Sequence, residues 1–194
     1  LDELLANSAS IGTSMFHCDA KIVDQESGRE VKPGAMGVLC LRSPHNFDGY
    51  LHDPTRTESI IDREGWIYTG DLAVQDRDGL VFIKGRADNM FVSGGENISP
   101  EEIENALMKH PAVAGAICAG IPDPKWGQAP VALVIFHAGR NATEEELKTF
   151  CRNYLADYKV PKHVRPVAEL PLTGAGKLNR HAAVTMFGQI IGGG

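Results

Sequence analysis

Residues 84–104, KGRADNMFVSGGENISPEEIE, divide this chain into two parts. The apolar run at 80–83, which leads into this stretch, is typical of a buried strand. Asp88 and Asn89 then interrupt the pattern, and both residue types tolerate the unusual backbone angles that a swivel needs. The stretch therefore predicts a junction between two folded units, with a plain linker and tight turn as the simpler alternative.

The second half of this stretch predicts a new structural beginning. A short strand at 90–92 runs into Gly94 and Gly95, which allow a ligand or another backbone to come close because they have no Cβ atom. Ser99 is placed as an N-cap of a helix over 99–109, with Pro100 at its first position and Glu102 completing a capping box.

The pattern of the part before the junction is typical of a small β structure. Short apolar or alternating segments follow one another with turn residues between them, and a short helix is predicted after a cap near Asp53. This pattern favours a small antiparallel barrel or curled sheet over residues 1–87. The predicted strands are 16–24, 36–42, 66–68, 72–74 and 80–83.

The part after the junction alternates between helical and strand patterns. Thr143 and Glu146 form a capping box, and six residues at helical spacing follow as a core stripe: Leu147, Phe150, Cys151, Tyr154, Leu155 and Tyr158. Strands are predicted at 112–120, 129–136 and 163–167, and a last helix at 179–187. The prediction is an α+β unit over 88–187, with two helices on one face of a small sheet and a disordered tail at 188–194. The whole chain is thus assigned to the α+β class.

Composition excludes several functions. The chain has 194 residues, a net charge of −6 and a pI near 5.6, which argue against a nucleic-acid binder. No apolar run reaches membrane-spanning length. Cys18, Cys40, Cys118 and Cys151 are far apart in sequence, so they are predicted to be reduced, as in a cytoplasmic protein. Neither they nor the histidines have metal-ligand spacing, so no metal site is predicted in this segment.

Three residues stand out as chemical candidates. Asp71, at the end of a predicted strand, has two acceptor oxygens that suit the paired hydroxyls of a ribose, although an Asx turn would also explain it. Arg86 offers a planar donor fork for a nucleotide, and a surface salt bridge is its alternative. Lys177 ends a glycine loop and could neutralise a carboxylate and a phosphate as they approach, although exposed loop lysines are common. Trp126 is interpreted as a loop anchor packed on the sheet.

Three motifs in order resemble the AMP-forming acyl-CoA synthetases. They are Arg86-Ala87-Asp88 with residues 93–104, the segment Tyr68-Thr69-Gly70-Asp71-Leu72, and residues 171–177, PLTGAGK. That family belongs to the adenylate-forming superfamily, with firefly luciferase and the adenylation domains of peptide synthetases.

The resemblance implies a role for each candidate. Residues 1–87 would be the β-rich end of a large nucleotide-binding domain, where Asp71, Arg86, Tyr68 and Thr69 hold ATP and AMP. Asp88 would be the hinge of a mobile C-terminal lid. Gly94 and Gly95 would line the channel for the pantetheine arm of CoA, and Lys177 would be the catalytic residue of adenylation.

The implied reaction has two steps. A carboxylic acid and ATP with Mg²⁺ give acyl-AMP and pyrophosphate, and the thiol of CoA then displaces AMP. ATP and CoA are substrates, and no tightly bound cofactor is expected. The motif around Lys177 also resembles a segment at which family members are switched off by acetylation, so a lysine acetyltransferase and a deacetylase are possible partners.

The chain departs from the family in what it lacks. The phosphate-binding loop, the segment with the Mg²⁺-binding glutamate and the acyl pocket are absent, and the resemblance covers roughly residues 10–187. We therefore expect a fragment that has no ligase activity alone and that needs the missing N-terminal part of the same enzyme.

Two alternatives stay open at this point. An adenylation domain of a peptide or polyketide synthetase would usually carry a sequence like QVKIRG after the hinge and a carrier domain downstream, and neither is found here. A non-catalytic module that binds a nucleotide or a partner is the other.

Overall fold

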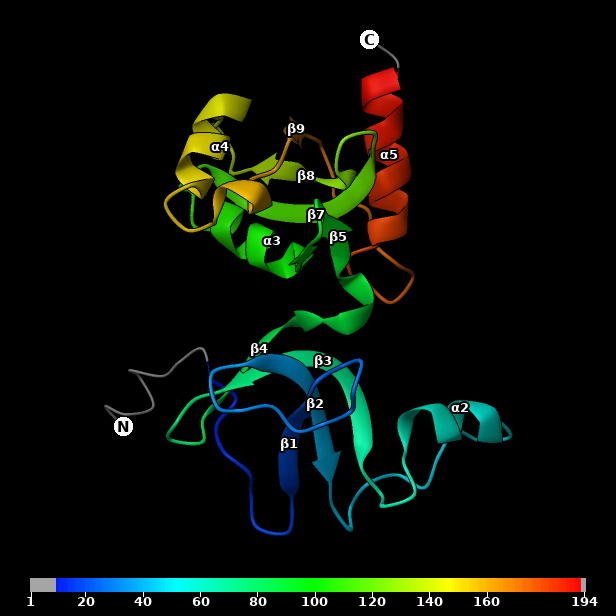
Figure 1. Cartoon of the computed structure of the whole chain (residues 1–194). Helices are drawn as coiled ribbons and strands as arrows, with labels where there is room; N and C mark the ends of the chain where they lie inside the picture. Colours follow the sequence, from blue (N-terminus) through cyan, green and yellow to red (C-terminus); the bar gives the residue numbers. More distant parts are fainter. Residues whose placement is uncertain (1–9, 193–194) are drawn as a thin grey trace. The chain divides into compact units, whose positions relative to one another are not determined.

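The computed structural model describes residues 10–192 and divides the chain into two compact units. The first unit is Leu1–Asp88 and the second is Asn89–Gly194 (Figure 1). The predicted features at residues 1–9 and 193–194 lie outside the described residues. Both units combine helices with sheets, which confirms the α+β assignment.

The first unit is a four-stranded antiparallel sheet in chain order. Its strands are β1 (Asp19–Val23), β2 (Met36–Arg42), β3 (Ile67–Gln75) and β4 (Val81–Arg86). Neighbouring strands pair β1–β2–β3–β4, and irregularities lie between Val38 and Cys40 and between Leu72 and Ala73. Such bulges increase the local twist of a sheet. The sheet is an open one, so of the two predicted forms the curled sheet is found rather than the closed barrel.

The first unit buries side chains on both faces of this sheet. Ile22, Leu39, Ala73 and Val81 pack together in one cluster and are almost fully buried. Val23 and Val38 pair on the opposite face and are also buried. The helix α2 (Pro54–Ile60) begins where the sequence predicted, because the side chain of Asp53 accepts a hydrogen bond from the backbone N–H of Arg56 at 2.9 Å.

The second unit contains a hairpin, a mixed sheet and three α-helices among its described residues. Its elements follow in the order β5 (Phe91–Ser93), β6 (Glu96–Ile98), α3 (Pro100–Met108), β7 (Val113–Asp123), β8 (Gly127–Phe136), α4 (Glu144–Cys151), β9 (His163–Pro166) and α5 (Arg180–Gly192). β7 pairs antiparallel with β8, and β8 pairs parallel with β9. Short 3-10 turns lie at Ala87–Asn89 and Asp157–Lys159.

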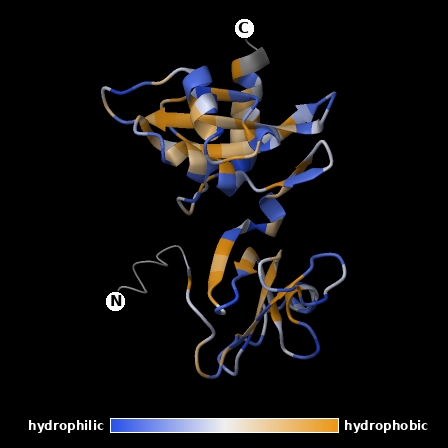
Figure 2. Ribbon diagram, turned by 60° about the vertical axis from the view of Figure 1, so that its left-hand side comes forward, coloured by the Kyte–Doolittle hydropathy of each residue, from blue (hydrophilic) through white to orange (hydrophobic). Residues whose placement is uncertain are grey.

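Two helices, α3 and α4, lie on one face of the β7–β8–β9 sheet, as predicted, and α5, for which no face was predicted, covers the other. Ala116 and Cys118 on β7 pack in one cluster with residues of α3 and α4, whereas Ile117 between them packs against Ala183 and Phe187 of α5. Successive side chains of a strand point to opposite faces, so each face has its own core. Figure 1 shows α5 at the right of the sheet, away from α3 and α4. The central strands are accordingly hydrophobic along much of their length (Figure 2).

Helix boundaries differ from the prediction in two places. α4 ends at Cys151, so Tyr154 and Tyr158 are about half exposed instead of continuing a buried stripe. α5 continues to Gly192, so residues 188–192, expected in a disordered tail, are helical. The capping box of α4 is confirmed: Thr143 and Glu146 bond each other's backbone N–H.

The cap of α3 differs as well. The Ser99 hydroxyl donates to the Glu101 carboxylate at 2.9 Å and makes no side-chain cap bond, and Glu102 is held by Lys159 at 2.6 Å. The predicted Ser99–Glu102 capping box does not form, because both side chains are engaged elsewhere.

Candidate functional site

The first unit brings Thr69, Asp71 and Arg86 together where β3 and β4 pair. Asp71 lies opposite Arg86 in the register of the two strands. The Arg86 guanidinium donates from Nη1 to the backbone oxygen of Thr69 at 2.8 Å and to Asp71 Oδ1 at 3.0 Å. Both side chains stay partly exposed, at 45% for Arg86 and 35% for Asp71. A ligand can therefore reach a carboxylate and a guanidinium that are already aligned.

Backbone geometry fixes this arrangement. Gly70 has a φ of +73°, and a Cβ atom there would lie 2.7 Å from Arg86 Nη2. The Thr69 hydroxyl donates to the backbone oxygen of Leu39 at 2.9 Å and accepts from the N–H of Asp71 at 3.0 Å. Thr69, not Asp71, thus makes the local turn bond, and the carboxylate of Asp71 is not used in an Asx turn.

The ion pair with Asp71 is the dominant influence on Arg86. Its hydrogen bond with Asp71 raises the pKa of Arg86 above the usual arginine value. The predicted alternative of a surface salt bridge is therefore realised in this structure, and it presents both partners side by side.

Tyr68 lies outside this hydrogen-bonded group. It is half-buried on β3 opposite Cys40, and burial raises the pKa of its hydroxyl. No hydrogen bond joins that hydroxyl to Thr69, Asp71 or Arg86 within residues 10–192.

Asp88 lies at the end of the first unit, because the division into units falls between it and Asn89. Its side chain is 82% exposed, and Oδ2 lies 3.4 Å from Arg86 Nη2. The residue sits in the 3-10 turn Ala87–Asn89, where the chain leaves β4. An exposed side chain on a short turn is compatible with backbone rotation at this point.

Lys177 belongs to the second unit and ends a closed turn. The backbone N–H of Thr173 donates to the oxygen of Lys177 at 2.7 Å, and that of Asn179 to the oxygen of Pro171 at 2.9 Å. Gly176 has a φ of +75° and donates back to Thr173 at 2.9 Å. The segment expected to be a flexible loop is thus a small hydrogen-bonded hairpin that holds an exposed lysine.

Gly94 borders a cavity of about 510 Å³ in the second unit. The backbone N–H of Gly94 donates to the oxygen of Trp126 at 2.9 Å, and its φ is +60°. A Cβ atom on Gly94 would lie 2.7 Å from Cε3 of Trp126, so the indole packs directly on this glycine. Gly95 has open space around its Cβ position and does not line the cavity.

Three residues of this cavity were not found as functional candidates from the sequence. Trp126, Tyr158 and Lys162 come from the β7–β8 turn, the 3-10 turn Asp157–Lys159 and the residue before β9. Trp126 packs on Gly94 but is 47% exposed, which is more than its interpretation as a packed loop anchor implies, and Tyr158 is 46% exposed. No spacing in the sequence unites segments so far apart. Exposed aromatic residues beside a lysine on a glycine-lined cavity suit a flat ring that carries a phosphate.

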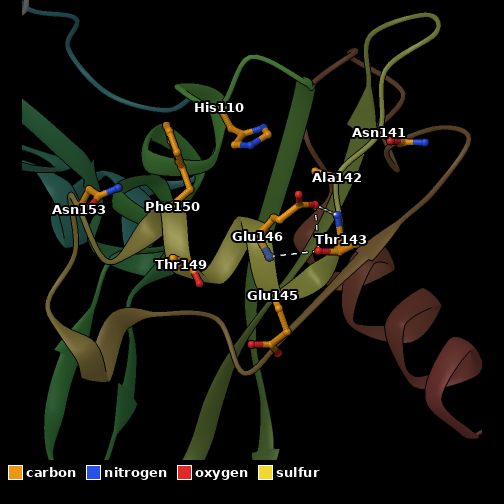
Figure 3. Close-up of a pocket in the computed structure, with 9 residues that line it drawn as sticks. All are labelled: His110, Asn141, Ala142, Thr143, Glu145, Glu146, Thr149, Phe150 and Asn153. Carbon is orange, nitrogen blue, oxygen red and sulfur yellow. Dashed lines mark hydrogen bonds between the residues drawn. The ribbon is translucent and has the colours of Figure 1, made fainter.

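A second cavity, of about 530 Å³, lies beside the first turn of α4. Figure 3 shows that the side chains of Thr143 and Glu146 face each other in the capping box there. His110 stacks edge-on with Phe150, with ring centroids 4.8 Å apart. These polar groups serve the helix cap and a ring contact.

A charge cluster ties the segment after Lys177 to α3. Arg180 donates to Glu104 Oε1 at 2.7 Å and to Glu101 Oε1 at 2.6 Å, and Asn89 donates to the same Glu101 oxygen at 2.6 Å. The carboxylate of Glu104 also accepts the backbone N–H of Cys118 at 2.7 Å. The first residue of the second unit and the first residue of α5 are therefore joined to one helix.

Two parts of the chain match known protein families. Residues 102–177 match the family model described as the AMP-binding enzyme C-terminal domain, and residues 1–51 match the AMP-binding enzyme model. The chain is 37% identical over 180 residues to a putative acyl-CoA synthetase, YngI, of Bacillus subtilis, covering 93% of this chain and 33% of the relative.

Solved structures of related enzymes have a similar fold. One is an o-succinylbenzoate CoA synthetase from Bacillus subtilis in complex with its acyl-adenylate intermediate, with a TM-score of 0.87, 32% identity and coverage of 94% of this chain and 37% of that one. Another is the amide bond synthetase McbA from Marinactinospora thermotolerans, with a TM-score of 0.86, 33% identity and coverage of 96% and 37%. The chain belongs to the adenylate-forming superfamily and corresponds to a C-terminal portion of its members. The curated relatives that it matches include an acyl-CoA synthetase and a 2-succinylbenzoate–CoA ligase, and the chain spans about one third of their length.

The described residues form neither a membrane-spanning helix nor a cluster of metal ligands. No helix among them is long and apolar enough to cross a membrane. Within residues 10–192, no group of three or more histidine, cysteine, aspartate or glutamate side chains is placed to hold a metal ion.

Proposed function

We propose that this chain provides the hinge, the ribose contact and the catalytic lid of an acid–CoA ligase. The enzyme joins a carboxylic acid to ATP, which releases pyrophosphate and gives an acyl-adenylate. The sulfur of CoA then attacks the acyl carbon, the bond to AMP breaks, and a thioester forms. The observation that carries the proposal is the pair of Asp71 and Arg86, aligned on adjacent strands just before the point where the two units divide.

Asp71 and Arg86 bind the nucleotide in this proposal. The carboxylate of Asp71 accepts hydrogen bonds from ribose hydroxyls, and the guanidinium of Arg86 holds it in place while offering its remaining N–H groups. Thr69 supports the turn between them through its bonds to Leu39 and Asp71. Tyr68 contributes a wall of this site rather than a polar contact.

Lys177 serves the first half-reaction. Its exposed ammonium neutralises negative charge that builds up as the carboxylate approaches the α-phosphate. Acetylation would remove this charge, so an acetyltransferase and a deacetylase that act on Lys177 would switch adenylation off and on. Peptide mapping by mass spectrometry of protein from cells tests this regulation, and Lys177 that is always unmodified contradicts it.

Asp88 and Gly94 serve the second half-reaction. Rotation about Asp88 withdraws Lys177 and presents the Gly94 cavity, a conformational gate of the hinge type. Trp126, Tyr158 and Lys162 then bind the nucleotide end of CoA by ring stacking and by charge. Gly95 stays open beside the path of the pantetheine arm.

ATP enters as its Mg²⁺ complex in this class of reaction. The described residues of this chain offer no cluster of metal ligands, so the ion's protein contacts are assigned to none of them.

Binding of a non-hydrolysable acyl-adenylate analogue to this chain tests the nucleotide site. Wild type should bind, and Asp71→Ala should weaken binding at least about tenfold because a charged acceptor is lost. Asp19→Ala is the matched control, since Asp19 forms a similar exposed ion pair with Arg42 in the same sheet, at 2.8 Å. Equal binding by wild type and Asp71→Ala would contradict the proposal.

The cavity at Gly94 distinguishes a CoA ligase from other members of the superfamily. The likeness to an amide bond synthetase leaves the acyl acceptor to be decided by this cavity. Binding of CoA there supports the ligase. Binding of the adenylate analogue without CoA would favour a different acceptor, and binding of neither would favour a non-catalytic module.

A further inference from the structure

The side chain of Asp123 bonds two of the residues that line the Gly94 cavity, Trp126 and Lys162. Asp123 is the last residue of β7, and its side chain is 4% exposed. Oδ1 accepts the backbone N–H groups of Lys125 at 2.9 Å and Trp126 at 3.0 Å. Oδ2 accepts Nζ of Lys162 at 2.6 Å. One buried carboxylate thus holds the turn that carries the indole and also the lysine.

These bonds place the indole. Oδ1 of Asp123 holds Trp126 from one side through its backbone N–H, and Gly94 holds it from the other through the Trp126 oxygen. The ring packs on Gly94, where no side chain intervenes. The ring is therefore fixed at the cavity edge, although 47% of the residue is exposed.

The same carboxylate places the charge. The ammonium of Lys162 has three N–H donors, and one of them is bonded to Asp123. Lys162 remains 52% exposed along its side chain, so the other donors face solvent and the cavity. A lysine without such an anchor would explore many rotamers, and ordering it on binding would cost free energy.

We propose that Asp123 is the positioning residue of this cavity, which orients Trp126 and Lys162 so that an adenine ring stacks on the indole while a phosphate of the same nucleotide meets the ammonium. This inference rests on the proposed function, which assigns this cavity to CoA, whose nucleotide end carries an adenine ring and phosphates. Asp123 itself does not touch the ligand.

The first unit contains a natural comparison. Asp62 Oδ1 accepts the backbone N–H groups of Glu64 and Trp66, each at 2.9 Å, in the same manner as Asp123 accepts those of Lys125 and Trp126. Asp62 has no lysine partner within the described residues. The turn alone therefore requires only one oxygen, and the bond from Asp123 Oδ2 to Lys162 is additional to it.

The experiment is a titration of this chain with CoA, followed by calorimetry. Asp123→Asn keeps an oxygen for the two turn bonds and removes the charge that holds Lys162. It should lower CoA affinity about five- to tenfold, as expected for loss of a charged hydrogen bond that orients a binding group. Lys162→Met should give a similar loss, and the double variant little more, because the two residues act as one unit. Asp62→Asn is the matched control and should bind CoA like wild type.

The outcomes separate this inference from the proposed function. Failure of wild type to bind CoA overturns the proposed role of the cavity. Binding by wild type that is unchanged in Asp123→Asn, or losses that add fully in the double variant, overturns the positioning role alone. If circular dichroism shows Asp123→Asn unfolded, Asp123→Glu is used, which keeps the charge and shifts it by one methylene. Wild-type affinity in that variant contradicts positioning.

Discussion

At the scale of single residues, neighbouring glycines have different reasons to be glycine. Gly94 and Gly95 both have positive φ, at +60° and +89°, yet only Gly94 has a side chain packed on its Cβ position. Backbone strain is thus common to both positions, whereas contact with Trp126 belongs to one. Substitutions at these two positions can therefore separate the effect of backbone strain from the effect of contact with Trp126.

Gly94→Ala should therefore displace the Trp126 ring, and Gly95→Ala should not. Both should lose about 1–2 kcal/mol of stability through left-handed strain. Only Gly94→Ala should also weaken CoA binding and shift the fluorescence of Trp126. Equal CoA affinities in the two variants would contradict the assignment of the cavity.

Gly70 in the first unit also combines a positive φ with a side chain packed at its Cβ position. Gly70→Ala adds a methyl group 2.7 Å from Arg86 Nη2 at a φ of +73°, so Arg86 must move away from Asp71. Gly65→Ala is its control, because Gly65 has a φ of +80° and open space around its Cβ position. Gly70→Ala should bind the acyl-adenylate analogue more weakly than Gly65→Ala, with both less stable than wild type by about 1–2 kcal/mol. Urea denaturation and the analogue titration measure the two effects.

At the scale of elements, α3 and α5 are joined by one arginine and two carboxylates. Burial raises the pKa of Glu104 above its usual value, although Arg180 and the N–H of Cys118 oppose that rise. Burial also raises the pKa of Glu101, but its bonds to Arg180 and Asn89 outweigh this and lower it overall. The same cation bonds both carboxylates, but Glu104 is the more deeply buried one, so its pKa ends raised whereas that of Glu101 ends lowered.

Arg180→Met and Glu104→Gln should differ sharply in stability. Arg180→Met leaves two partly buried carboxylates without their cation and should cost about 3–5 kcal/mol. Glu104→Gln keeps an oxygen for Cys118 and removes a charge that burial disfavours, so it should cost less than about 1 kcal/mol. Urea denaturation followed by circular dichroism measures both. Similar losses would show that Glu104 is needed as an ion.

The elements also show what the sequence could predict. Strand β2, the cap at Asp53 and the capping box of α4 depend on residues close in sequence, and local patterns were sufficient for them. The face of the sheet on which α5 packs could not be predicted, because a continuous apolar run such as that of β7 does not show which helix covers which of its faces. The cap of α3 was missed because Lys159, fifty-seven residues away, binds Glu102.

The candidate sites likewise divide into one that local sequence could predict and one that depends on long-range packing. Asp71 and Arg86 lie in motifs that a family resemblance can identify, and local pairing of β3 and β4 brings them together. Trp126, Tyr158 and Lys162 meet only through the fold of the second unit. Nothing in their spacing gave a signal, and the exposed surface of Trp126 becomes visible only in three dimensions.

At the scale of the whole molecule, acid should destabilise the second unit in a defined range of pH. Burial raises the pKa of Glu144, but bonds from Arg165 and Lys148 outweigh this and lower it to about 2. The bond from Lys162 lowers the pKa of Asp123 to about 2 as well. Because both values lie below those of the unfolded chain, this stability is complete above about pH 4.5 and is lost as pH falls toward 2.

Glu144→Gln should remove part of that pH dependence. Near pH 7 the variant should be less stable than wild type by about 1–3 kcal/mol. The difference should shrink as pH falls toward 2, because the pKa of the wild-type carboxyl is about 2 and the group becomes protonated there. Thermal unfolding at several pH values, with amide signals of β8 followed by NMR, provides the measurement. A constant difference at every pH would show that Glu144 acts through packing and not through its charge.

The closed hairpin around Lys177 has a consequence for speed. Backbone bonds among residues 171–179 close this hairpin on itself. Under the proposed hinge mechanism, the ammonium therefore reaches the nucleotide when the whole second unit turns and not when a flexible loop moves. Friction between water and that large body then opposes every arrival of the positive charge. We expect formation of the acyl-adenylate to slow as glycerol thickens the solvent, whereas an enzyme with a freely swinging lysine would be far less sensitive.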